Sequence, residues 1–168
     1  MVANGAAALA RPVVERARIA VAIAFGVSGL AFASWISRTP AIRDALDLTN
    51  AQFGLLLLCT SVGAVSALPL SGPLVHAIGP HRTVLLGAAA VTVGMLAVAV
   101  GVAVVSPPLA GAGLLLTGTG LSSWDVAMNV EGADVERRLD RPLMPRFHAG
   151  FSLGTVTGAL LGAGCAWL

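Results

Sequence analysis

Long apolar runs separated by short polar segments dominate this chain. A helix needs about 20 residues to cross about 30 Å of hydrocarbon, and five runs reach that length. The runs cover approximately residues 18–37, 52–72, 83–105, 109–130 and 148–168. They lack the strict apolar–polar alternation of membrane barrel strands. The pattern therefore predicts an all-α, polytopic membrane helical bundle over residues 18–168, with about five transmembrane helices, an N-terminal tail at 1–17 and a long loop at 131–147.

Composition and charge agree with a lipid environment. Of the 168 residues, 57% are hydrophobic and 11% are charged, whereas soluble domains carry about 25% charged residues. All ten basic residues are arginine, and a cytoplasmic N-terminus puts two of them outside, at Arg38 and Arg43. The inner ones are Arg11, Arg16, Arg18, Arg82, Arg137, Arg138, Arg141 and Arg146. Since inner loops are enriched in basic residues, this distribution predicts that the tail and the 131–147 loop are cytoplasmic. The arginines are interpreted as topological markers, with no nucleic-acid partner.

The segment after the first run carries a helix start signal. Thr49 and Gln52 have the spacing of a capping box, and Leu48 and Phe53 occupy the positions of a hydrophobic staple. We therefore expect the second helix to begin near Asn50.

A single acid interrupts the apolar sequence. No Asp, Glu, Lys or Arg occurs from Thr83 through Trp124, and Asp125 then follows, four residues ahead of Asn129. A carboxylate in a membrane helix costs about 2.5–3.5 kcal/mol on insertion scales and usually faces a polar cavity or partner. Asn129 lies one turn away on the same face, so the pair could bind a coupling proton or a polar solute. The alternative is that Asp125 lies near the inner membrane surface and is hydrated there.

Two tryptophans and one arginine are interpreted first as membrane anchors. Trp124 and Trp35 are typical of interfacial aromatic belts, with a solute platform as the alternative for Trp124. Arg38 follows Trp35 by three residues and is expected to extend to the outer headgroups. A role for Arg38 in an extracellular gate is the alternative.

The fifth run has a regular stripe of small residues. Glycines recur every four residues at Gly150, Gly154, Gly158 and Gly162. Such a stripe lets another helix approach closely. We therefore expect this helix to pack against another one, either within the chain or on a missing part.

The sequence offers no metal site, cofactor site or enzymatic centre. His76, His81 and His148 form no set with metal-ligand spacing. The glycine-rich stretch GAGLLLTGTG lies inside a predicted span and follows no soluble strand, unlike a nucleotide-binding loop. Ser122 and Ser123 lack a neighbouring base. The protein is therefore not expected to be an enzyme.

One short connection resembles a known membrane-protein motif. The segment GPLVHAIGPHR, residues 72–82, resembles the signature of the loop between the second and third helices of major facilitator superfamily (MFS) transporters. Gly72, Gly79 and Arg82 match that signature, and His76 stands where the family usually has an acid.

Three longer segments extend the resemblance over roughly residues 20–165. WISRTPAIRDALDLTNAQFG, DVAMNVEGADVE and RPLMPRFHAGFSLGTVTGA resemble a bacterial branch related to sugar and fucose permeases. The resemblance implies a proton- or substrate-coupling acid at Asp125, with Asn129 and His148 as companions. It implies a proton-coupled secondary transporter of small polar solutes, with sugars as the class, in the bacterial inner membrane.

The length of the chain qualifies this expectation. MFS transporters have two six-helix halves with the solute site between them, so five helices imply a truncated N-terminal half. We expect such a fragment to need its missing C-terminal half or another membrane helix partner, and not to transport by itself. The alternative is a stand-alone five-helix membrane protein that packs against a separate partner.

Overall fold

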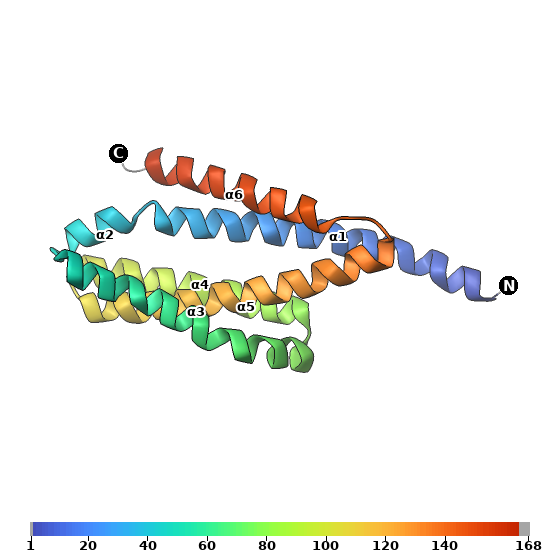
Figure 1. Ribbon diagram of the computed structural model, residues 1–168, viewed down its shortest axis with the longest axis horizontal. Coiled ribbons are helices and arrows are strands. Elements are labelled where there is room, and N and C mark those ends of the chain that lie inside the picture. The colour runs from blue at the N-terminus through green and yellow to red at the C-terminus, as the bar shows by residue number, and fades with distance from the viewer. Residues whose placement is uncertain (1, 165–168) are drawn as a thin grey trace.

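The computed structural model describes residues 2–164, with side chains from residue 11 onward, and these residues form an elongated helical bundle (Figure 1). The helices are α1 (Val2–Ile36), α2 (Thr39–Ala45), α3 (Asn50–Ile78), α4 (Pro80–Ala103), α5 (Pro107–Leu139) and α6 (Met144–Gly164). The prediction of an all-α bundle is confirmed for this part of the chain. Residues 165–168, the end of the fifth predicted span, lie outside it.

The capping box at the start of α3 is present in the structure. The Thr49 hydroxyl oxygen accepts the Gln52 backbone N–H at 3.3 Å, and the Gln52 side-chain oxygen accepts the Thr49 N–H at 2.9 Å. Each side chain thereby satisfies a backbone donor that the first turn leaves free. The predicted helix start at Asn50 is confirmed.

Three stretches of the described chain are long and apolar enough to cross a membrane: Arg11–Ala45, Asn50–Ile78 and Pro80–Ala103. The remaining long helices, α5 and α6, have 33 and 21 residues, which is long enough for a span. Within the described residues, neither helix is among these three stretches. Membrane insertion of these two helices therefore stays a prediction.

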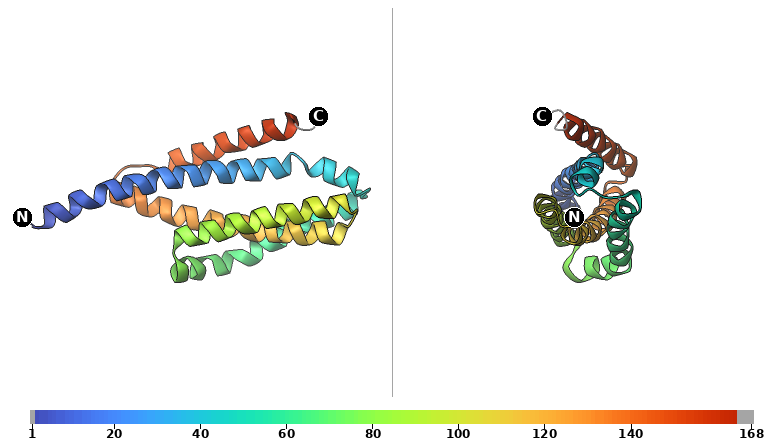
Figure 2. Two further views of the ribbon diagram at one scale, coloured as in Figure 1. Left: turned by 180° about the vertical axis from the view of Figure 1, so that it is seen from behind. Right: turned by 90° about the vertical axis from the view of Figure 1, so that its left-hand side faces the viewer.

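Helix α5 lies at the centre of the bundle and packs along α3 and α4, whereas α6 packs along α1. Figures 1 and 2 show the pair of α1 and α6 on one side of α5, with α3 and α4 on the other. Glycines of α5 allow the close contacts with both neighbouring helices. A Cβ on Gly118 would overlap the Thr60 carbonyl oxygen of α3. A Cβ on Gly120 would lie 2.6 Å from the Gly87 carbonyl oxygen of α4. Backbones approach closely at such positions, and van der Waals packing then holds helices together in lipid.

Several helix ends differ from the predicted boundaries. Helix α1 begins at Val2, so the predicted tail at 1–17 is helical in its described part, consistent with the high helix propensity of its alanines. The predicted loop at 131–147 is also largely helical, because α5 continues to Leu139 and α6 starts at Met144. Asp134 forms ion pairs with Arg137 and Arg138, three and four residues along α5, and such pairs stabilise a helix in water.

Candidate functional site

A cavity of about 300 Å³ lies between α1, α3, α5 and α6. Its polar lining residues are Ser28, Trp35, Thr60, Ser122 and Asp125, and the aromatic residues Phe32 and Phe151 line it as well. At a rise of 1.5 Å per residue, Thr60 lies about 15 Å along α3 from Asn50. Ser28 lies about 12 Å along α1 from Ile36. By the same measure Trp35 lies one residue from the end of α1, and Asp125 lies about 27 Å along α5 from Pro107. The lining residues are therefore spread along the length of the bundle.

Asp125 is exposed, lines this cavity and is held by Asn129. The Asn129 side-chain amide donates to the Asp125 backbone carbonyl at 2.9 Å and to carboxylate oxygen Oδ1 at 3.3 Å. Both contacts join residues one turn apart on α5, as the spacing predicts. The amide therefore orients the carboxylate while leaving its other oxygen free to accept a proton or a solute hydroxyl.

His148 lies within electrostatic reach of Asp125, at the start of α6. Its Nδ1 is 2.9 Å from the Met144 carbonyl oxygen, so that nitrogen carries the donated hydrogen and Nε2 is free. The imidazole ring also packs on Phe25, with ring centroids 5.1 Å apart. The structure thus brings together three of the four predicted coupling residues, from two helices.

Arg38, the fourth predicted coupling residue, is separate from this group. It is exposed at the N-terminus of α2 and lines a different cavity, of about 420 Å³, between α1 and α4. Trp35 lines both cavities. The two cavities therefore lie on either side of the Trp35 indole.

Both tryptophans, interpreted from the sequence as interfacial belt residues, are buried inside the bundle. Trp35 and Trp124 have 6% and 5% of their surface exposed, and neither indole N–H has a hydrogen-bond partner within the described chain. Trp124 packs against α4, where Gly87 leaves room for it. The two side chains occur in the two hydrophobic clusters of the bundle, and their place relative to the membrane surface stays a prediction.

Sequence reasoning also missed Ser28 and Thr60 as cavity residues. Ser28 is 3% exposed, and the Thr60 hydroxyl oxygen is buried without a hydrogen-bond partner. Serine and threonine in membrane helices usually bond to their own backbone, as Thr157 does with Leu153. The sequence contains no signal that separates a serine or threonine that lines a cavity from one that bonds to its own backbone.

The glycine stripe of α6 lies against α1. A Cβ on Gly154 would overlap the Gly26 carbonyl oxygen, one on Gly158 would lie 2.5 Å from the Leu30 carbonyl oxygen, and one on Gly162 would overlap the Ser37 hydroxyl. Gly150 is less tightly placed, since a Cβ there would be 3.8 Å from the nearest atom. The helix that the stripe contacts is therefore part of this chain.

The MFS-like motif forms a one-residue corner between α3 and α4. Gly79 has a φ of 85°, a left-handed conformation that glycine adopts without strain. Gly72 and His76 lie in the last two turns of α3, and Arg82 lies in the first turn of α4. The side chains of His76 and Arg82 are exposed. The corner thus places the motif at the same end of the bundle as the N-terminal part of α1.

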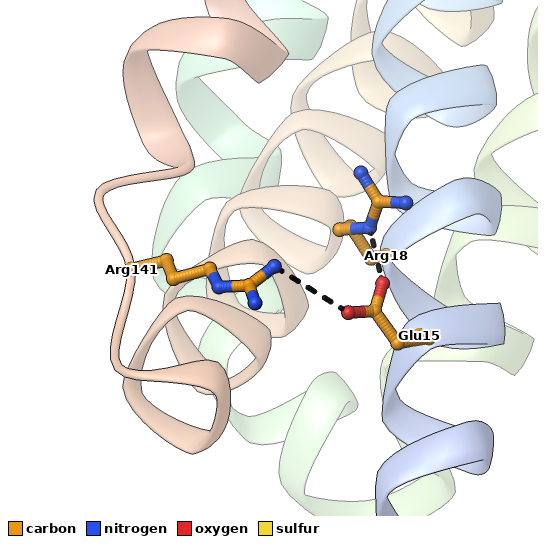
Figure 3. Close-up of polar contacts among 3 residues, drawn as sticks. All are labelled: Glu15, Arg18 and Arg141. Carbon is orange, nitrogen blue, oxygen red and sulfur yellow. Dashed lines mark hydrogen bonds and ion pairs between the residues drawn. The ribbon is translucent and has the colours of Figure 1, made fainter.

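The same end contains a small polar network (Figure 3). Glu15 of α1 pairs with Arg18 at 2.6 Å and with Arg141 of the α5–α6 connection at 3.7 Å. Glu136 accepts the backbone N–H groups of Leu143 and Met144 at 2.6 and 2.7 Å. These contacts fix where α6 starts relative to α1 and α5.

Comparison with known proteins identifies transporter relatives. Over 151 residues the chain is 32% identical to an uncharacterized MFS-type transporter of Yersinia pestis. The aligned segment covers 90% of this chain and 38% of that transporter. It is 34% identical over 139 residues to an uncharacterized transporter of Sinorhizobium fredii, covering 83% of this chain and 36% of the relative. It is also 26% identical over 141 residues to the membrane protein MosC of Rhizobium meliloti, and the aligned segment covers 84% of this chain and 34% of MosC. The chain has transporter homologues.

These relatives are much longer than the chain, which spans little more than a third of their length. No family model and no solved structure matches the chain. The chain is therefore similar to part of these membrane proteins, and it contains helices apolar enough to cross a membrane.

Proposed function

We propose that this chain forms part of a secondary active transporter of the MFS type that moves small polar solutes, with sugars as the class, across a bacterial inner membrane. The observation that carries the proposal is that Asp125, an acid among apolar helices, lines a cavity of a chain with transporter homologues. An ionisable residue within an apolar helix bundle marks a solute or ion pathway.

In this proposal Asp125 is the proton-coupling group. Asn129 holds one carboxylate oxygen, and the free oxygen accepts a proton or a solute hydroxyl. His148 supplies a second titratable group within electrostatic reach. Protonation would remove the carboxylate charge and so change how strongly the cavity attracts a hydroxyl-bearing solute.

Alternating access needs two halves that move against each other around a central site. The proposed role of this chain is to supply helices of one half, which fits the third of each relative that it spans. By this proposal the chain binds solute but does not transport alone. The arginine distribution supports a cytoplasmic N-terminus.

The alternative is a stand-alone membrane protein with a separate partner. Its best support was the glycine stripe, which contacts α1 of the same chain. The stripe therefore no longer calls for an outside helix, and the transporter proposal is favoured.

The test is uptake into proteoliposomes with an inward proton gradient, using L-fucose, D-galactose and D-mannitol. The chain is reconstituted alone and as the longer product that includes the coding sequence after Leu168. We expect proton-driven uptake of one of these solutes only with the longer product. Coupled uptake by the chain alone would refute the shared-half proposal, and absence of binding and uptake in both forms would refute the transporter proposal.

A further inference from the structure

A further cavity, of about 340 Å³, lies between α1 and the start of α6. Two arginines line it, Arg18 of α1 and Arg146 of α6, together with the apolar residues Ile19, Ile23 and Phe147. Among the described residues, no acid lines this cavity, and it shares no lining residue with the cavity that contains Asp125. Ligand pockets start at about 300 Å³, so the space suits a group the size of a lipid headgroup.

The two arginines keep unused hydrogen-bond donors. Arg18 pairs with Glu15 through Nε, at 2.6 Å, and Figure 3 shows its two terminal nitrogens turned away from Glu15. Glu15 also pairs with Arg141 at 3.7 Å, so two arginines share its charge. Within the part of the chain that the structure describes, the side chain of Arg146 forms no ion pair. Glu136 accepts backbone N–H groups at the start of α6 and lies outside the lining. The cavity therefore has an excess of positive charge.

An apolar track leads away from the arginines along the outer face of α1. Ile19, Ile23 and Val27 are exposed and follow one another every four residues, which places them on one face of the helix. The first and fifth predicted spans begin at residues 18 and 148. The arginines thus lie where the sequence predicts the membrane surface, and the track lies where it predicts hydrocarbon.

We propose that the Arg18–Arg146 cavity binds the phosphate headgroup of an anionic phospholipid, with an acyl chain along Ile19, Ile23 and Val27. Arginine matches phosphate with two parallel hydrogen bonds, and basic pockets between membrane helices bind anionic headgroups. The ammonium of phosphatidylethanolamine would face the same positive charge without a carboxylate in the lining, so an anionic lipid is favoured. The site requires that α1 and α6 lie in a membrane, but it does not depend on Asp125 or on any solute.

The first measurement compares two lipids with identical acyl chains, phosphatidylglycerol and phosphatidylethanolamine. The full chain in neutral detergent is titrated with each lipid, and bound lipid is counted by native mass spectrometry. We expect the unmodified chain to bind one phosphatidylglycerol more tightly than phosphatidylethanolamine. Arg18→Gln and Arg146→Gln should each weaken phosphatidylglycerol binding at least about tenfold, the effect of a hydrogen bond to a charged group.

Arg137→Gln is the matched control for charge. Arg137 is exposed near the end of α5 and lies outside the cavity, so this variant loses the same charge without losing a lining residue. General attraction between arginine and an anionic membrane surface is worth about fivefold in affinity. Phosphatidylglycerol binding by Arg137→Gln should therefore weaken by no more than that.

The second measurement locates the lipid. With Cys59 and Cys165 replaced by serine, a fluorophore is attached at Val27→Cys or at Val62→Cys. Val62 lies on α3 and is as exposed as Val27, at 47%. In phosphatidylcholine vesicles, phosphatidylglycerol with a spin-labelled acyl chain should quench the fluorophore at Val27 more than spin-labelled phosphatidylethanolamine does. At Val62 the two lipids should quench equally.

Three results would overturn the lipid site. They are equal affinities of the unmodified chain for the two lipids, a loss of affinity in Arg137→Gln as large as in Arg18→Gln and Arg146→Gln, and the same ratio of quenching by the two lipids at Val27 and Val62. Inorganic phosphate in large excess should leave phosphatidylglycerol bound. Displacement by phosphate would identify a site for the free anion and overturn the lipid assignment. None of these results changes the solute uptake assay, so the lipid site and the transporter proposal fail separately.

Discussion

Replacing Gly154 by alanine should weaken the contact between α6 and α1, whereas the same change at Gly150 should not. A methyl group on Gly154 would overlap the Gly26 carbonyl oxygen and lie 3.0 Å from the Leu30 nitrogen. A methyl group on Gly150 would lie 3.8 Å from the nearest atom, which is ordinary contact. Backbone atoms cannot rotate away, so the helices must separate, and overpacking of this kind costs about 1–3 kcal/mol.

The paired design isolates packing from helix propensity. Each glycine-to-alanine substitution raises the helix propensity of α6 by the same amount, about 0.8–1.0 kcal/mol. The difference in docking free energy between the two variants therefore reports only the packing. That difference corresponds to about a 5- to 150-fold change in the α1–α6 docking equilibrium. After Cys59 and Cys165 are replaced by serine, it can be measured by energy transfer between dyes on cysteines placed at the exposed positions Ile23 and Leu153, during titration with a denaturing detergent. Coincident transitions for the two alanine variants would refute the packing argument.

Three further predictions concern the cavity and the end of the bundle where α6 starts. Asp125→Asn should abolish proton-driven accumulation by the longer product but retain downhill exchange of solute. The control Asp134→Asn should leave proton-driven accumulation intact. Uptake into proteoliposomes measures both variants. Glu136→Ala should destabilise the start of α6 by about 1.5–3 kcal/mol, because it removes hydrogen bonds to a charged group, measured as a lower thermal unfolding midpoint. Gly79→Ala should cost about 1–3 kcal/mol, because a φ of 85° with a ψ of 158° is essentially restricted to glycine. Gly72→Ala, in open helical space, should not lower that midpoint.

The helical class of the protein follows from the sequence because hydropathy reports directly on burial in lipid. The start of α3 was predictable for a local reason, since Thr49 and Gln52, three residues apart, bond to each other's backbone. The ends of α1 and α5 were not predictable from apolar runs, because these helices continue past the apolar residues. Past its apolar residues, α5 is stabilised by ion pairs of Asp134 with Arg137 and Arg138. A hydropathy pattern does not reveal such pairs.

The candidate site was predictable only where a residue is unusual in its surroundings. Asp125 stands out because acids are rare in apolar runs, and Asn129 follows from helical spacing. Trp35 and Thr60 do not stand out, because tryptophan and threonine are common in membrane helices and only the packing of α1 against α3 and α5 decides what they face. The glycine stripe predicted a close contact, but its partner depends on tertiary structure.

The distribution of glycines explains why the cavity lies where it does. Within the α1–α6 pair, and between α5 and its neighbours α3 and α4, glycines bring backbones together and leave no room for a solute. Around Gly132 of α5 the neighbours are side chains instead: the three atoms nearest to an added Cβ belong to Met144 and Phe147 of α6 and Val21 of α1. Helices held apart by side chains enclose space, and the Asp125 cavity lies along this boundary, with walls from both groups of helices. Small residues thus determine the site indirectly, because they close the other helix contacts and leave this one open.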